Sequence, residues 1–406
     1  MLLELAGKSL WNRRGTVMLC VLSIGISLFV LLGIEHLRQQ TKDNFTRSVS
    51  GADLIVGARG GELNLLLYSI FRIGDASNNI SWSSYQTLAS DPAVAWSIPL
   101  TLGDSHRGYR VLGTDASYFK HYRYGQQQAL ELAAGNIFEQ PLEVVLGHEV
   151  TRKLDYHRGS RIIIAHGTGS TSFSNHDQHP FTVTGILTPT GTPVDQTLHV
   201  SLESLERIHQ GWPGSATSSR LQPESITAFI VGLESRMQTF RFQRQVNTYP
   251  EEALMAVLPG VALTQLWRVV GVVEQSLLMI SSLVLLAAML GMTTMMLASM
   301  RERRSEIAVL RAMGASPAFI FFGVQIEAVI ITALGVLLGS GLLLAAVAVG
   351  GDILLEQFGL YVGTVELTGR GSLIVVAAFL VAVVCALAPG IGAYRISLQS
   401  RLTGNA

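Results

Sequence analysis

The side chains best suited to chemistry are three histidines, His166, His176 and His179, which are potential metal ligands. His176 and His179 lie three residues apart in the polar stretch GTGSTSFSNHDQH, and both would reach one ion if this stretch turns. No cysteine and no third ligand follow at a spacing typical of zinc sites. Solvated loop histidines are therefore the alternative interpretation.

Patterns typical of enzymes are missing from the sequence. Neither the G-x-S-x-G turn of hydrolases nor the H-E-x-x-H of metalloproteases occurs. Gly7, Lys8 and Ser9 match only the end of a phosphate-binding loop, which also requires a preceding strand and a glycine where Leu2 stands. We therefore expect a non-catalytic chain that binds no cofactor of its own.

The composition indicates a membrane protein. Of the 406 residues, 49% are hydrophobic and 14% are charged, whereas ordinary globular domains carry about 25% charged residues. The 29 basic residues balance the 29 acidic ones, so the net charge gives no indication of nucleic-acid binding. Cys20 and Cys385 both lie in apolar runs, and the polar middle of the chain is built without disulfides.

Four apolar runs can span a bilayer, which requires about 20 residues. They cover residues 16–34, 270–300, 319–350 and 372–394. The first is longer than the apolar part of a signal peptide and lacks a cleavage pattern, so we interpret it as a retained anchor. The predicted fold is an integral membrane protein with four transmembrane α-helices (1 + 3). A large mixed α/β extracytoplasmic domain, residues 35–268, is inserted between helices 1 and 2.

Basic residues predict the orientation, because they favour cytoplasmic segments. They cluster before the first run, between the second and third, and after the fourth: Lys8, Arg13, Arg14, Arg301, Arg303, Arg304, Arg311, Arg395 and Arg401. The loop at 351–371 carries three acidic residues and one arginine. We therefore predict that both termini and the segment 301–318 are cytoplasmic, with a tail at 395–406.

The first fifteen residues are expected to form an amphipathic helix along the inner leaflet. Leu2, Leu5 and Leu10 would lie in lipid, and Lys8 would lie near the headgroups with the two arginines that follow.

The extracytoplasmic region alternates short β-rich and helical patterns. β-rich runs begin at residues 53, 109, 143, 161, 181 and 198, and capped helices are predicted at 81–92 and 201–214. The apolar segment 63–74 belongs either to the core of the domain or to a surface that meets the outer leaflet or a hydrophobic substrate. Burial of Leu66, Tyr68 and Phe71 would exclude the second interpretation.

Two carboxylates and a pair of glycines stand out inside the apolar runs. Glu274 and Glu327 are costly in a membrane and suggest a function. Glu327, near the cytoplasmic end of its run, is also explained by a hydrogen bond to a neighbouring helix or a basic residue. Gly335 and Gly339 have the spacing that permits close helix packing, within one chain or between two copies.

Between the second and third runs lies RERRSEIAVLRAMGASP, residues 301–317. Read as a helix over 301–314, it places Ile307, Leu310, Arg311 and Gly314 on one side, and Gly314 is expected to end it. From the residues alone, this helix either sets the topology at the membrane surface or contacts a partner.

The order of residues in this segment resembles the coupling segment of MacB/FtsX-like ABC transporter permeases. The pattern E-R-x-x-E-I-x-x-L-R-A-x-G-A is matched by Glu302, Arg303, Glu306, Ile307, Leu310, Arg311, Ala312, Gly314 and Ala315. The resemblance extends to GADLIVGARGG after the first span, to FTVTGIL at 181–187, and to the layout of one span, a large external domain and three spans.

The resemblance implies a transmembrane subunit in the bacterial inner membrane that acts on an external substrate. A separate cytoplasmic ATPase, which binds ATP and Mg, would dock on residues Arg301, Glu302, Arg303, Arg304, Glu306, Ile307, Leu310, Arg311 and Gly314. Two copies of the chain would pair, and ATP-driven movement would be relayed to the external domain for export or extraction of a substrate, with a periplasmic protein or adaptor as a further partner. The alternative is a signalling or scaffold subunit that activates a periplasmic partner, with a metal as one link.

Overall fold

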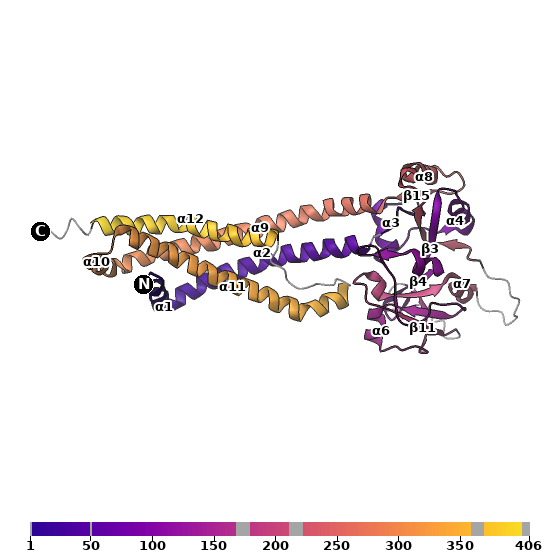
Figure 1. Ribbon diagram of the computed structural model, residues 1–406, viewed down its shortest axis with the longest axis horizontal. Helices are drawn as coiled ribbons and strands as arrows, with labels where there is room; N and C mark the ends of the chain where they lie inside the picture. The colour runs from indigo at the N-terminus through magenta and orange to yellow at the C-terminus, as the bar shows by residue number, and fades with distance from the viewer. Residues whose placement is uncertain (1, 49–50, 168–178, 211–221, 359–368, 400–406) are drawn as a thin grey trace. The chain divides into compact units, whose positions relative to one another are not determined.

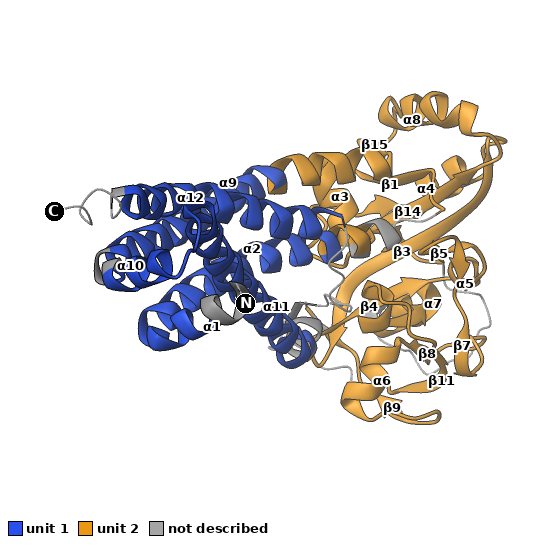
Figure 2. Cartoon of the chain, turned by 60° about the vertical axis from the view of Figure 1, so that its left-hand side comes forward, with its two compact units in different colours: residues 1–40, 271–358, 362–406 blue, residues 41–270, 359–361 orange. Residues whose placement is uncertain are grey.

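The computed structural model describes residues 2–48, 51–167, 179–210, 222–358 and 369–399 (Figure 1). The chain divides into two units (Figure 2). The helical unit comprises residues 1–40, 271–358 and 362–406, and the mixed unit comprises residues 41–270 and 359–361.

The helical unit contains the four apolar runs as long helices. Within the described residues, four helices are long and apolar enough to cross a membrane: α2 (Arg14–Ser48), α9 (Pro259–Glu302), α11 (Pro317–Phe358) and α12 (Arg370–Gln399). Two short helices, α1 (Leu2–Asn12) and α10 (Arg304–Ala312), complete the unit. The mixed unit lies in the sequence between α2 and α9, so the predicted fold class is confirmed.

Each long helix extends beyond the apolar run that predicted it. α2 continues past Ile34 to Ser48, and α9 begins at Pro259, a residue suited to the first helical position because its missing N–H would be unpaired there. The boundaries between the two units therefore fall inside α2 and α9.

The core of the helical unit is built from small and flexible side chains. α12 contributes Ala378, Ala382 and Ala386, which recur every four residues and are at most 1% exposed. The same core contains flexible methionines of α9, of which Met289 and Met292 are fully buried. α1 packs against this core through Leu10, which is half-buried. The side chains of Leu2 and Leu5 lie outside the described residues.

The glycine pair of α11 serves packing within one chain. A β-carbon at Gly335 would lie 2.6 Å from the side chain of Ile24, and one at Gly339 would lie 2.7 Å from the carbonyl oxygen of Gly25. α2 and α11 thus approach each other as closely as their backbones permit. Of the two alternatives left open by the sequence, the structure shows intrachain packing.

We expect Gly339→Leu to destabilise the helical unit by about 1–3 kcal/mol, because the new side chain would meet the α2 backbone, which cannot rotate away. Gly341→Leu is the matched control, since a β-carbon there meets nothing within 4 Å and the gain in helix propensity is the same. Denaturation in mixed micelles, followed by circular dichroism, measures both. Equal stability of the two variants would contradict the close α2–α11 contact.

A proline inside α12 leaves one backbone carbonyl without its helix hydrogen bond, and a side chain of a neighbouring helix donates to that carbonyl instead. Pro389 has no N–H to donate to the carbonyl oxygen of Cys385. The hydroxyl of Thr293 on α9 lies 3.4 Å from that oxygen and 2.9 Å from the carbonyl oxygen of Met289. α12 and α9 are therefore joined by a polar contact where the helix hydrogen bond is missing.

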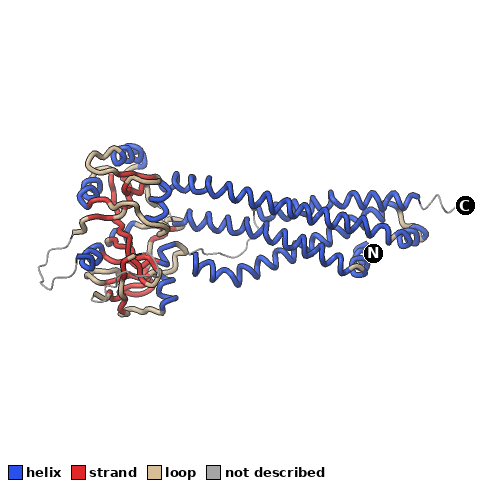
Figure 3. Tube along the Cα trace, turned by 180° about the vertical axis from the view of Figure 1, so that it is seen from behind, coloured by secondary structure: helices blue, strands red, loops and turns tan. Residues whose placement is uncertain are grey.

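The mixed unit is organised around an eleven-stranded sheet, whose strands are red in Figure 3. The order along the main path is β15-β1-β14-β3-β4-β12-β8-β11-β7, with β10 paired to β3 and β9 to β11. The β4–β12 and β8–β11 pairs are parallel and the others are antiparallel. The strands are β1 (Leu54–Ala58), β3 (Val94–His106), β4 (Tyr109–Thr114), β7 (Leu132–Gly135), β8 (Glu143–Leu146), β9 (Arg161–Ile162), β10 (Ala165–His166), β11 (Phe181–Leu187), β12 (Thr197–Ser201), β14 (Ala228–Leu233) and β15 (Leu254–Val257).

Helices cover both faces of this sheet. Along β1, Ile55 packs with residues of α3, whereas Leu54 and Val56 pack with residues of α4 and α8, as expected where side chains alternate between two buried faces. The helices are α3 (Glu62–Ser69), α4 (Trp82–Ala89), α5 (Ala116–His121), α6 (His148–Leu154), α7 (Leu202–Gln210) and α8 (Thr239–Asn247). Two 3-10 turns (Pro193–Gln196 and Arg236–Gln238) and two small pairs complete the unit: β2 (Ile80–Ser81) with β13 (Ser225–Ile226), and β5 (Arg123–Tyr124) with β6 (Gln128–Ala129).

Three sequence predictions for this unit can be compared with the structure. Ser81 caps α4, accepting a hydrogen bond from the backbone N–H of Ser84 at 3.3 Å. Leu66, Tyr68 and Phe71 are at most 5% exposed, so the segment 63–74 belongs to the core and the surface interpretation is excluded. The run at 161–167 forms the two short strands β9 and β10 instead of one.

Candidate functional site

The segment predicted to contact a partner is a short helix with a defined break at each end. α9 ends at Glu302, Arg303 is not helical, and α10 begins at Arg304, so the expected single helix over 301–314 is wrong at its start. At the other end, Gly314 has a left-handed φ of 94°. Its N–H donates to the Arg311 carbonyl, and the N–H of residue 315 donates to the Leu310 carbonyl, both at 3.0 Å. These two bonds form a Schellman motif, which glycine favours because it has no β-carbon.

The break between α9 and α10 places Arg303 beside Glu327 of α11. The guanidinium donates two hydrogen bonds to the carboxylate, of 2.8 and 3.2 Å. The two side chains are 13% and 9% exposed, so the pair is largely removed from solvent. Arg303 also lies 3.5 Å from the carboxylate of Glu306, which is 61% exposed. Glu327 therefore makes the hydrogen bond to a basic residue that the sequence offered as the structural explanation of this carboxylate.

α10 has an inner and an outer face. Ile307 is 4% exposed and packs in the core of the helical unit, and Leu310 is half-buried. Arg311 is also half-buried, and its guanidinium donates to the carbonyl of Ala315 at 2.7 Å, which fixes the turn toward α11. These predicted contact residues therefore hold α10 in place, whereas Gly314 is exposed.

The outer face of α10 is apolar at two positions that the sequence analysis did not single out. Val309 is 59% exposed and Met313 is 72% exposed, and they are four residues apart on one side of the helix, next to the exposed Glu306. The four-residue spacing of Val309 and Met313 was the feature of the sequence that could have indicated this apolar face. Arg301 and Glu302 close α9 and Arg304 opens α10, but their side chains lie outside the described residues.

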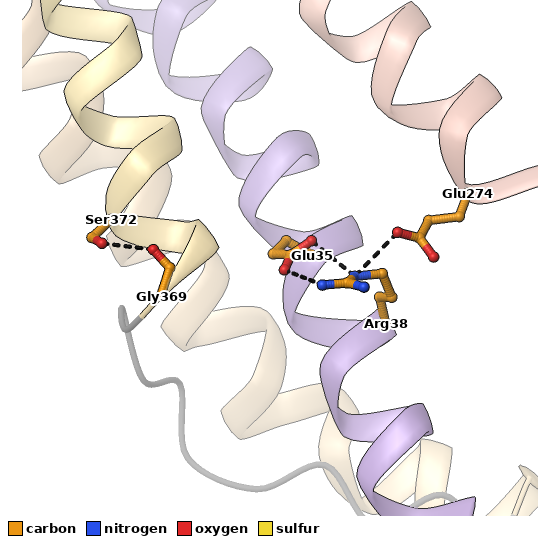
Figure 4. A network of polar contacts seen from close by, with 5 residues as sticks. All are labelled: Glu35, Arg38, Glu274, Gly369 and Ser372. Carbon is orange, nitrogen blue, oxygen red and sulfur yellow. Dashed lines mark hydrogen bonds and ion pairs between the residues drawn. The ribbon is translucent and has the colours of Figure 1, made fainter. Parts of the chain in front are cut away.

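A second ion cluster joins the first two long helices. The guanidinium of Arg38 on α2 donates to both oxygens of Glu35, at 2.6 and 3.0 Å, and lies 3.1 Å from the carboxylate of Glu274 on α9 (Figure 4). Their side chains are between 6% and 22% exposed. Glu274, predicted as an intramembrane carboxylate, is thus part of a link between α2 and α9, and Arg38 was not anticipated as its partner.

Of the three predicted metal ligands, only His179 has its side chain among the described residues. No group of three or more His, Cys, Asp or Glu side chains with metal-binding geometry occurs among the described residues. The backbone of His166 pairs with residue 104 in the sheet, but its side chain and all of His176 lie outside the description. His179 is half-buried and lies two residues before the first residue of β11.

Another histidine is buried in the core of the mixed unit. His199 on β12 is fully buried, and its ring centre lies 5.2 Å from that of Tyr118. Its Nδ1 lies 3.4 Å from the carbonyl oxygen of Val145. Burial lowers the pKa of His199 to about 3, and the nearby charge of Arg72 acts in the same direction. The imidazole is therefore neutral in the folded chain at ordinary pH.

Comparisons with known proteins agree with the sequence pattern. The model of the MacB-like periplasmic core domain matches residues 16–249, and the model of the FtsX-like permease C-terminal matches residues 278–398. No curated protein matched the chain.

Two solved structures are similar to part of the chain. The periplasmic region of MacB from Actinobacillus actinomycetemcomitans is 12% identical, with a TM-score of 0.36, and the match covers 55% of this chain and 97% of that one. The extracellular domain of YknZ, a noncanonic ABC-type transporter from Gram-positive bacteria, is 13% identical with a TM-score of 0.32, covering 50% and 98%. Because the periplasmic core model alone spans more than half of the 406 residues, the chain belongs to the MacB/FtsX-like family of transporter permeases.

Proposed function

We propose that this chain is the membrane subunit of an ABC transporter and that it transmits the movement of a separate cytoplasmic ATPase to its mixed unit. The ATPase binds ATP and Mg, this chain is not catalytic, and two copies of each assemble. Both termini and α10 face the cytoplasm, in keeping with the basic residues around them. Movement of the mixed unit then exports or extracts a substrate, with a periplasmic protein as a further partner.

The observation that carries this proposal is the construction of α10. The helix is held to its own unit from the inside by Ile307 and is flanked by the Arg303–Glu327 pair. Its outer face presents Val309 and Met313, two large apolar side chains without cover among the described residues. The exposed apolar face of α10 is suited to bind another protein. Because the opposite face is packed in the helical unit, α9 and α11 would move together with α10 when the bound protein moves.

The extent of α2 and α9 supports the second half of the proposal. Both helices contain a boundary between the helical and the mixed unit, and Arg38 joins them through Glu274. A displacement at the α10 end of α9 is therefore transmitted along a continuous helix whose hydrogen bonds resist compression.

Purification of the tagged full-length chain from its native host in mild detergent, followed by mass spectrometry, tests the proposal. We expect a P-loop ATPase to accompany the parent chain. In the variant Val309→Asp/Met313→Asp its amount is expected to fall at least about tenfold, because two charges replace the apolar contact.

The control is Trp11→Asp, which introduces one aspartate, against two in the test variant, at a side chain of α1 that is 74% exposed. This variant is expected to retain the ATPase, and circular dichroism verifies that all variants keep their helices. Absence of an ATPase from the parent, or equal amounts with both variants, would refute docking on α10.

A further inference from the structure

A cavity of about 430 Å³ lies in the helical unit between α1, α10 and α11. This volume is within the usual range for sites that bind small molecules. The α1 side is polar, with Lys8, Ser9, Asn12 and Arg13 in the lining. Lys8 and Asn12 are exposed, so the cavity is accessible from the α1 side.

The opposite side of the cavity is apolar. It is lined by Met300 of α9, Ile307 and Leu310 of α10, and residues of α11 that include Ile320 and Val324. Water in the cavity would form hydrogen bonds with the polar side, but hydration of the apolar side costs free energy. A hydrocarbon would cover the apolar side but would leave the polar groups without hydrogen-bond partners. A molecule with a polar head and an apolar tail satisfies both sides.

The charges of the lining indicate the sign of the polar head. Three cations, Lys8, Arg13 and Arg303, face two carboxylates, Glu306 and Glu327. Arg303 pairs with both carboxylates, at 2.8 and 3.5 Å. The positive charge contributed by α1 therefore lies on the polar side of the cavity, where a phosphate ester would be bound.

The neighbourhood of the cavity fits the level of lipid headgroups. Trp11, adjacent to the lining residue Asn12, is 74% exposed, and tryptophan is enriched at the membrane interface. We propose that this cavity binds an anionic phospholipid, with its phosphate at Lys8 and Arg13 and the start of its acyl chains against Ile307 and Val324. The bound lipid would contact α1, α10 and α11 at once. The inference concerns the helical unit alone and does not depend on the ATPase.

Native mass spectrometry of the full chain in detergent, with equal amounts of dioleoyl phosphatidylglycerol and dioleoyl phosphatidylcholine, tests this site. We expect one phosphatidylglycerol to be retained at least about fivefold more than phosphatidylcholine, because two basic residues attract the anionic headgroup. Lys8→Glu is expected to abolish this preference. Arg14→Glu makes the same change of charge at an exposed residue outside the lining and is expected to preserve it.

A second variant separates the cavity from a general attraction of α1 for anionic lipid. Ser9→Trp keeps every charge but fills the cavity, so it is expected to lose the retained phosphatidylglycerol while circular dichroism stays unchanged. Equal retention of the two lipids, or a preference that persists in Ser9→Trp, would overturn the proposal. Displacement of the lipid by glycerol 3-phosphate at an equal concentration would instead identify a soluble phosphate ester and likewise overturn it.

Discussion

Arg303→Met is expected to lower the free energy of unfolding of the chain by about 3–5 kcal/mol, the usual cost of leaving a buried charge without its partner. The substitution removes the guanidinium that donates to both oxygens of Glu327, whose carboxylate is 9% exposed. Glu327→Leu is expected to cost less, because Arg303 retains the exposed carboxylate of Glu306 3.5 Å away.

The double variant Arg303→Met/Glu327→Leu is expected to be more stable than Arg303→Met. It removes both charges and so avoids desolvation of either, and apolar side chains suit a site lined by Met300 and Ile320. Denaturation in mixed micelles followed by circular dichroism measures the three variants against the parent. Single losses below about 1 kcal/mol that simply add would show an ordinary exposed ion pair instead.

Acidification is expected to destabilise the mixed unit through His199. The folded-state pKa of about 3 lies below the value of about 6.5 for an unfolded histidine. Below pH 6.5 the unfolded chain therefore binds a proton that the folded chain excludes, and stability falls as the pH falls toward 3. From pH 7.5 to pH 5 this amounts to about 2 kcal/mol, from 1.36 kcal/mol for each pH unit below 6.5.

His199→Leu isolates this contribution, because other buried groups act in the opposite direction. Burial raises the pKa values of Asp115 and Asp195, so both carboxyl groups favour the folded state as the pH falls. Between pH 7.5 and pH 5, we expect the free energy of unfolding of the parent to fall by about 2 kcal/mol more than that of His199→Leu. Chemical denaturation of the full chain at the two pH values measures this difference. His157→Gln, at a side chain that is 77% exposed, should behave as the parent does. A parallel pH dependence of parent and His199→Leu would contradict a neutral buried imidazole.

Local patterns in the sequence were sufficient to predict most helices and strands, but they did not predict which of these elements contact each other. The apolar runs predicted the four long helices, and Gly314 predicted the end of α10, because both depend on residues close in sequence. The strand β3 was missed although it is the longest of the sheet. Its Pro99 cannot donate to a ladder and argues against a central strand, yet the residue pairs with Phe229, 130 positions away.

The candidate site shows the same limit. The pattern around Ile307 and Arg311 located the correct segment, but burial decides which residues face outward, and burial depends on α9, α11 and α12 packing around it. Arg303 was grouped with the partner-facing residues because it belongs to the pattern that resembles the coupling segment. The break in the helix turns it inward to Glu327, a contact between residues 24 positions apart.

Site-specific photo-crosslinking measures the central claim most directly. A benzophenone amino acid is introduced at Met313 on the outer face of α10, or as a control at Val349 of α11, which is 75% exposed and 36 positions further along the chain. In native membranes, irradiation is expected to join the Met313 variant to a P-loop ATPase and to leave the Val349 variant without this product. An ATPase product at Val349 and none at Met313 would contradict the assignment of α10 as the surface that receives the ATPase.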